Sequence, residues 1–167
     1  MKLILAGFNG TWRKESGIIL SKRLGRSFFD IEQMIEEKEK DRIAHISQVK
    51  GIDYLKKLQH QAVKQVSHYE ECIISVPADI FSDETNTKTL KSSATIIWLT
   101  ADVSIILLRL YPGWESKSLL KKQNALTHIK QMLKQQDFSH IADRIIDTSS
   151  FSPEETVDMI QQLLTTF

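Results

Sequence analysis

The first 24 residues constrain the fold more than any other part of this 167-residue sequence. Residues 3–6 are a short apolar run, a loop with Gly7 and Gly10 follows, and residues 14–24 have the spacing of an amphipathic helix. A buried strand that enters a helix through a glycine-containing loop is the setting in which backbone N–H groups bind anions. The sequence therefore predicts an α/β fold with its candidate site at this loop.

Strand and helix patterns alternate along the rest of the chain. Apolar, β-branched runs predict buried strands at residues 3–6, 72–76, 95–99 and 144–147, with a shorter strand at 27–29. Helical spacing fills the intervals, including a weak helix at 85–90, and Ser152-Pro153 followed by two glutamates predicts a helix start near Pro153. Such alternation predicts a parallel sheet covered by helices on both faces.

Composition excludes several classes of partner. The chain has 22 Lys and Arg against 21 Asp and Glu, so its net charge of +1 gives no reason to expect a nucleic acid or a membrane surface. The single Cys72 cannot form an internal disulfide, and residues 1–6 are too short for a signal peptide, so we expect a cytoplasmic protein. The five histidines lack metal-ligand spacing, and no metal site is expected.

The glycine loop departs from the phosphate-loop pattern G-x-x-x-x-G-K-[ST] at three positions. Gly7 matches, but Trp12, Arg13 and Lys14 stand where the pattern has glycine, lysine and a hydroxyl. A bulky residue at positive φ costs roughly 1–3 kcal/mol, so we expect the loop to relax and the indole to fill the space of a phosphate. Lys14 cannot bind magnesium, because an ammonium has no lone pair.

Beyond the loop, the chain resembles shikimate kinases. Residues 12–30 keep that family's spacing without a gap, and Asp30-Ile31-Glu32 stands at its "D-x-D" motif. The segments 51–56, 95–99, 141–148 and 152–155 resemble its "G-E-x-x-F-R", "VVWL", "VADLVVDT" and "SPEE" segments. The resemblance implies one three-layer αβα domain over residues 1–167, a five-stranded parallel sheet in the order 2-3-1-4-5, and a lid-like segment around 111–125.

The resemblance also implies roles for individual residues. The phosphate loop would comprise Gly7, Asn9, Gly10, Thr11, Trp12, Arg13 and Lys14. Arg109 and Pro153 fall where the family holds adenine, although a surface arginine and an N1 proline are the ordinary interpretations. If the chain is active, Arg13, Asp30 and Lys117 would be catalytic.

The acceptor site that the resemblance implies is altered. Glu32 keeps a carboxylate, whereas Lys56 and Gln135 replace two carboxylate-binding arginines and Pro77 replaces part of a glycine loop. Asp30 and Glu32 suit a helix dipole as well as an acid pair. Trp98 fits the core, and Trp114 fits either a lid or an exposed aromatic on a partner-binding loop.

Two hypotheses follow for function. The first is a shikimate kinase homologue that is catalytically impaired or inactive, a pseudoenzyme kept for binding or regulation, with no cofactor. The alternative is an active ATP- and Mg-dependent small-molecule kinase that uses an unusual phosphate loop. A nucleotide or phosphate-like anion is then the expected ligand, and the altered arginines argue against a small hydroxylated carboxylate.

Overall fold

Five parallel strands form the central sheet of the computed structural model, which describes residues 1–166. The strand order β2-β3-β1-β4-β5 confirms the predicted order. Each predicted strand is present, and its bounds differ from the prediction by at most one residue at either end. The strands are β1 Leu3–Gly7, β2 Ser27–Asp30, β3 Cys72–Pro77, β4 Thr95–Thr100 and β5 Arg144–Asp147.

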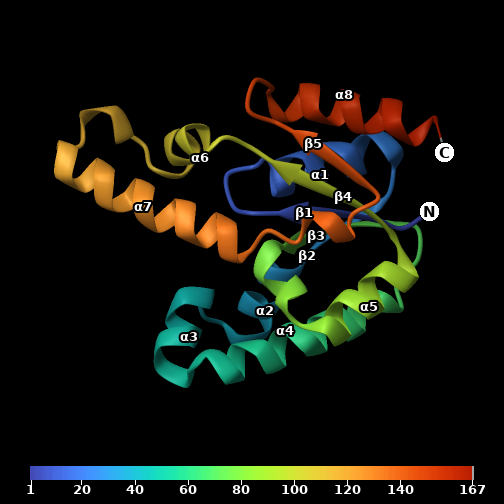
Figure 1. Cartoon of the computed structure of the whole chain (residues 1–167). Coiled ribbons are helices and arrows are strands. Elements are labelled where there is room, and N and C mark those ends of the chain that lie inside the picture. Colours follow the sequence, from blue (N-terminus) through green and yellow to red (C-terminus); the bar gives the residue numbers. More distant parts are fainter. Residues whose placement is uncertain (167) are drawn as a thin grey trace.

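Helices cover both faces of this sheet (Figure 1). One face carries α1 and α8, which contact each other, and the other carries α2 to α5. The α6–α7 pair extends away from the edge of the sheet (Figure 1). The helices are α1 Arg13–Leu24, α2 Ile31–Glu39, α3 Ile43–Lys50, α4 Ile52–Ser67, α5 Glu84–Ser93, α6 Val103–Leu110, α7 Leu119–Gln135 and α8 Pro153–Leu164, with short 3₁₀ helices η1 Ala78–Ser82, η2 Trp114–Ser116 and η3 Ser139–Ile141.

Successive residues of the strands supply the two main cores. Leu3 and Leu5 of β1 pack with α1 and α8, whereas Ile4 and Ala6 pack toward α2, α4 and α5. All of β1 is buried, as expected for a strand covered on both faces. A third cluster joins α6 to α7, and Trp114 packs against it, partly buried. Trp98 lies in the core, as predicted.

The parallel arrangement collects the candidate site at one edge of the sheet, where the carboxyl ends of the strands meet. The register pairs Gly7 of β1 with Pro77 of β3, and Asp30 of β2 with Ser75 of β3. A side chain at position 7 would come within 2.3 Å of the Leu99 carbonyl oxygen, so this close approach requires glycine.

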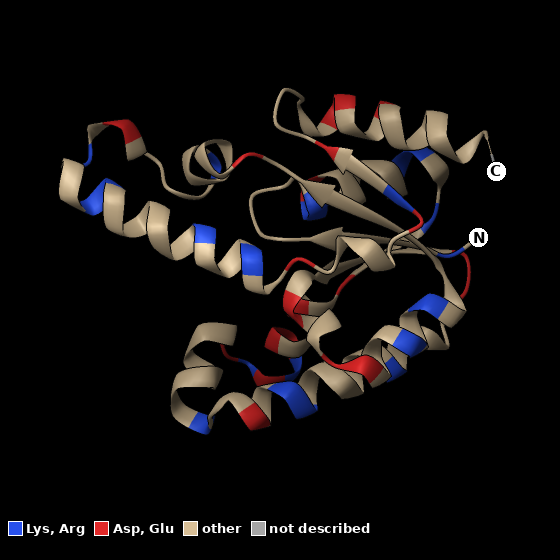
Figure 2. Cartoon of the chain, viewed as in Figure 1, with Lys and Arg blue, Asp and Glu red and all other residues tan. Residues whose placement is uncertain are grey.

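Charged residues of both signs are interspersed along the helices (Figure 2). Within residues 1–166, no helix combines the length and the apolar content needed to cross a membrane. The segment 111–125, which the resemblance assigns to a lid, contains η2 and the first turns of α7. It lies on the part of the molecule that projects from the sheet (Figure 1).

The start of α8 is the helix end that the sequence specified best. The Ser152 hydroxyl accepts a hydrogen bond from the Glu155 N–H at 3.1 Å, and the Glu155 carboxylate accepts one from the Ser152 N–H at 2.8 Å. Pro153 occupies the first helical position, as predicted. Together these contacts form a capping box, which satisfies N–H groups that the helix itself leaves unpaired.

We predict that Ser152→Ala lowers the free energy of unfolding by about 1 kcal/mol, because it removes one half of the capping box. Urea unfolding followed by circular dichroism measures the change. The matched control is Ser92→Ala near the end of α5, where the hydroxyl bonds only to a carbonyl of its own helix. Equal losses in the two variants would contradict the role of the cap.

Candidate functional site

The loop between β1 and α1 has three residues at positive φ, although its sequence departs from the motif. Gly7, Gly10 and Trp12 have φ values of 147°, 84° and 64°. Trp12 is therefore in the left-handed region, and our expectation that the loop relaxes around it is wrong. Left-handed backbone costs a non-glycine residue roughly 1–2 kcal/mol. Contacts of the indole must offset that cost.

Two contacts hold the Trp12 indole. Its Nε1–H donates a hydrogen bond of 2.8 Å to the carbonyl oxygen of Phe151, in the loop between β5 and α8. The guanidinium carbon of Arg109 lies 4.2 Å from the centre of the indole, in cation–π contact. The indole is thus fixed against α6 and the β5–α8 loop. The expectation that it occupies the space of a phosphate receives no support.

Arg109 links three segments of the site, so the surface interpretation is wrong for this residue. Its guanidinium donates to the carbonyl oxygens of Gly10 at 3.0 Å and Thr148 at 2.6 Å, and to the Thr148 hydroxyl at 3.0 Å. Burial lowers the pKa of Arg109, although an arginine stays charged in proteins. Pro153 lies two residues beyond Phe151, so the structure brings both predicted adenine residues to the Trp12 side of the loop.

Arg13 points into the protein, toward the carboxyl ends of β2 and β3. Arg13 is 4% exposed, and its guanidinium donates to the Ser75 hydroxyl at 2.6 Å and to the Asn9 side-chain oxygen at 3.1 Å. Carboxylate oxygens of Asp30 and Glu32 each lie 3.8 Å from it. The cation that stands at the phosphate-lysine position is therefore neutralised within the protein.

The two acids beside Arg13 differ in their surroundings. Asp30 is buried; one carboxylate oxygen caps α2 by accepting the Gln33 N–H at 2.8 Å, and the other has no hydrogen-bond partner among residues 1–166. Glu32 is about one-third exposed. Burial raises the pKa of Glu32, Arg13 opposes that shift, and Asp30 and Asp79 add to it. The helix interpretation is confirmed for Asp30, which caps α2, whereas a role for the two acids as a functional pair stays a prediction.

A cavity of about 160 Å³ lies at the carboxyl ends of β1 and β3, and we call it the β1–β3 cavity. Glu32 and Pro77 line it, as the resemblance implies. Lys56 and Gln135 are exposed and do not line it, whereas the next residue, Gln136, does. Its full lining comprises Gly7, Phe8, Asn9, Glu32, Pro77, Ala78, Asp79, Met132 and Gln136.

Sequence reasoning missed Asp79 and Gln136. The signal for Asp79 was its position just after a buried parallel strand, where ligand-binding side chains gather. Lys14 and Lys117 are exposed, the first at the start of α1 and the second on the projecting segment. Within residues 1–166, no group of three or more His, Cys, Asp or Glu side chains is arranged to hold a metal ion.

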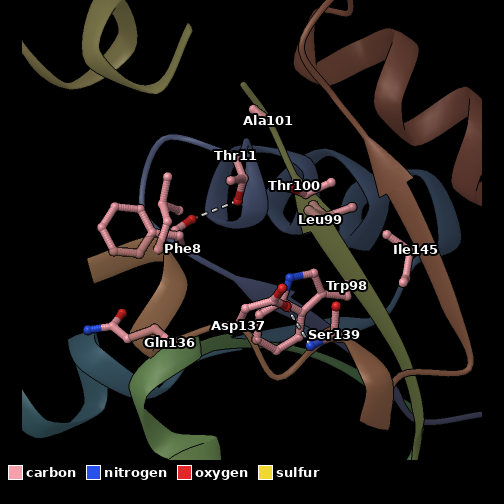
Figure 3. A pocket seen from close by; sticks show the side chains of 11 residues that line it. Phe8, Thr11, Trp98, Leu99, Thr100, Ala101, Gln136, Asp137, Ser139 and Ile145 are labelled. Atoms are coloured by element: carbon pink, nitrogen blue, oxygen red, sulfur yellow. Dashed lines mark hydrogen bonds between the residues drawn. The ribbon is translucent and has the colours of Figure 1, made fainter. Parts of the chain in front are cut away.

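A neighbouring cavity of about 180 Å³ lies beside the carboxyl end of β4 (Figure 3). It shares Phe8 and Gln136 with the β1–β3 cavity, and Thr11 lines it. The Thr11 hydroxyl donates to the Phe8 carbonyl at 2.7 Å (Figure 3). Hydrogen bonds from the Ser139 hydroxyl and N–H lower the pKa of Asp137 on the opposite wall. The hydrogen bond from Thr11 to Phe8 joins two residues of the β1–α1 loop and so stabilises its conformation.

The strand order and the helix-opening loop after β1 define the P-loop kinase class of fold. Within that class, a family model described as shikimate kinase matches residues 13–165. The shikimate kinase of Persephonella marina is 29% identical, over 95% of both chains, and that of Geobacter metallireducens is 30% identical, over 93% of this chain and 87% of the relative. This chain belongs to the shikimate kinase family.

Solved structures agree with this fold. The shikimate kinase of Acinetobacter baumannii, in complex with shikimate, superposes with a TM-score of 0.88 at 22% identity, covering 99% of this chain and 93% of that one. The YorR protein of Bacillus subtilis, in complex with phosphorylated GDP, gives a TM-score of 0.61 at 16% identity, covering 99% and 96%. At these identities the likeness concerns the fold.

We predict that Trp12→Phe lowers the free energy of unfolding by about 0.5–1.5 kcal/mol, because it keeps an aromatic ring over Arg109 but removes the hydrogen bond to Phe151. Urea unfolding measures the loss. Trp114→Phe serves as the control, since the same substitution there removes no hydrogen bond found within residues 1–166. A loss no larger than in this control would show that the indole N–H does not anchor the loop.

The raised pKa of Glu32 predicts a pH-dependent stability. An acid whose pKa is raised in the folded state favours folding in its protonated form, so its contribution is complete below its ordinary pKa of 4.5 and is lost as pH rises through the folded-state value. The stability of Glu32→Gln relative to wild type should therefore rise between about pH 4 and about pH 7. Thermal unfolding at both values measures it, with Glu154→Gln, an exposed residue in the first turn of α8, as the control. A difference that falls with pH would contradict this sign.

Proposed function

We propose that this shikimate kinase homologue does not transfer phosphate at an appreciable rate and serves in binding or regulation. The observation that carries the proposal is the position of Arg13, which stands where the family motif has its phosphate-binding lysine. Its guanidinium is buried, bonded to Ser75 and Asn9, and lies between the carboxylates of Asp30 and Glu32. A phosphate would have to compete with these acids for the same cation.

That competition has a large cost. Withdrawing Arg13 would leave Asp30 buried without its counter-ion, and separating a buried ion pair in this way costs roughly 3–5 kcal/mol. Such a penalty weakens binding by about 10²–10⁴-fold. Only contacts between the phosphates and the loop would offset this cost. The substitutions on either side of Arg13, Trp12 and Lys14, remove several of those contacts.

The other two substitutions act in the same direction. Lys14 is exposed and offers no lone pair to a magnesium ion, in place of the hydroxyl of the motif. The resemblance places adenine against Arg109, but the Trp12 ring already stacks on that guanidinium. A nucleotide bound in the manner of the family would therefore displace the indole and break its hydrogen bond to Phe151.

Two observations favour the alternative of an active kinase. Asp30 presents a buried carboxylate oxygen without a hydrogen-bond partner within residues 1–166, and the loop keeps the positive φ values of an anion cradle. If a bound nucleotide drew Arg13 toward its phosphates, Asp30 would be free to take part in magnesium binding or proton transfer.

A coupled assay with ATP, magnesium and shikimate decides between the two. We expect turnover far below about 1 s⁻¹, the low end of typical kinase rates. The shikimate kinase of Persephonella marina, assayed in parallel, checks that the coupling system works. Turnover at or above that rate in this chain would refute the proposal and support the active kinase.

We predict that Trp12→Gly, Arg13→Lys and Lys14→Ser, combined, raise the affinity for magnesium ATP by at least about tenfold, since they restore the motif. Shikimate phosphorylation should stay low, because Lys56, Pro77 and Gln135 are unchanged. Calorimetry and the coupled assay measure the two effects, and Trp12→Gly alone, which leaves Arg13 in place, is the control.

Full shikimate turnover in the triple variant would show that the acceptor site is intact, contrary to this account. Unchanged affinity for ATP would instead show that the three substitutions are not what impairs nucleotide binding.

A further inference from the structure

The charged side chains that line the β1–β3 cavity are both acids. Glu32 reaches it from the start of α2, and Asp79 from η1, while no lysine or arginine is among the residues that line it. Its other polar side chains are the amides of Asn9 and Gln136, which bind hydroxyl groups without a preference for charge. Phe8 and Met132 supply apolar surface. The cavity is therefore built around negative charge.

The residues behind the wall do not reverse this charge. Arg13 is the cation beside the cavity, and it is already shared by Asp30 and Glu32. When ionised, Arg13, Asp30, Glu32 and Asp79 together carry one positive and three negative charges. The Gln59 amide that donates to Asp79 at 3.0 Å is neutral. A carboxylate in the cavity would add a like charge at short range, whereas a cation would complete the balance.

Neither substituted arginine position supplies a cation to this wall. Lys56 is exposed on α4, and the exposed Gln135 carries no charge. Within residues 1–166, no group of three or more His, Cys, Asp or Glu is placed to hold a metal ion, and an organic cation would complement the acids of the cavity. At about 160 Å³ the cavity is smaller than the roughly 300–1,000 Å³ of pockets for drug-sized ligands, which restricts it to a small molecule.

From these observations we propose that the β1–β3 cavity binds a small hydroxylated amine rather than a hydroxylated carboxylate. The ammonium would donate hydrogen bonds to Glu32 and Asp79, and the hydroxyls would bond to the amides of Asn9 and Gln136. This inference rests on the proposed binding role and names the ligand class of that site. Its test requires no nucleotide and no turnover.

Three probes with one ring test the charge preference: shikimate, its uncharged methyl ester, and the analogue in which an aminomethyl group replaces the carboxylate. We expect calorimetry on the wild-type protein to show the amine binding at least about tenfold more tightly than the ester, and shikimate most weakly, since a hydrogen bond between charged groups outweighs a neutral one. Shikimate binding as tightly as the amine, or no binding by any probe, would overturn the proposal.

Substitutions then locate the effect. Glu32→Gln and Asp79→Asn preserve side-chain volume and remove one charge each, so each should weaken amine binding by about tenfold or more and leave ester binding nearly unchanged. Glu154→Gln, an exposed residue in the first turn of α8 that does not line the cavity, should change neither. Gln136→Lys places a cation on the wall and should reverse the preference toward shikimate. Equal losses for amine and ester would mean that the acids act only on the shape of the cavity.

An experiment on Lys56 can contradict the proposed amine preference most directly. If its long side chain bends into the cavity and completes a carboxylate site, wild-type protein will bind shikimate and Lys56→Met will abolish that binding, which overturns the proposal. If Lys56→Met leaves amine binding unchanged, the acids alone set the preference. Turnover with ATP is measured separately, so failure of this inference and failure of the proposed function remain distinguishable.

Discussion

The buried guanidinium of Arg13 is the interaction on which the rest of the site depends. It joins the first residue of α1 to the ends of β2 and β3, because parallel pairing sets Ser75 directly beside Asp30. A cation there balances the charge of two acids that the sheet brings to the same edge. In the proposed function, the same placement holds the charge away from a phosphate, so the ion pairs that stabilise the site would also weaken its chemistry.

On the other side of the loop, Trp12 and Arg109 also pair polar groups of the site within the protein. The indole keeps the backbone in a left-handed conformation by bonding to Phe151 and stacking on Arg109. Arg109 in turn binds the carbonyls of Gly10 and Thr148. Polar groups around the β1–α1 loop are thus already paired within the chain. In the proposed function, side chains of the protein take the contacts that a ligand would otherwise make in this loop.

The fold followed from local sequence, because apolar runs and the Ser152-Pro153 cap each specify structure without distant partners. The directions of the Trp12 and Arg13 side chains did not follow from local sequence, because they depend on contacts with residues that are distant in the chain. A positive φ has an energy cost for an isolated tryptophan, but in the folded protein the tertiary contacts of Trp12 outweigh that cost. The cavity shows the same limit: α7 ends at Gln135, and Gln136, the non-helical residue that follows it, lines the cavity although Gln135 does not.

The most direct test of the account is to observe the guanidinium of Arg13 while nucleotide is added. Its NMR signals, assigned by their loss in Arg13→Lys, report whether the side chain stays with Asp30 and Glu32. We predict that magnesium ATP at millimolar concentration leaves these signals unchanged. A shift that saturates with ATP would show that Arg13 leaves its acids for the phosphates, and would contradict the view that the loop has withdrawn from phosphoryl transfer.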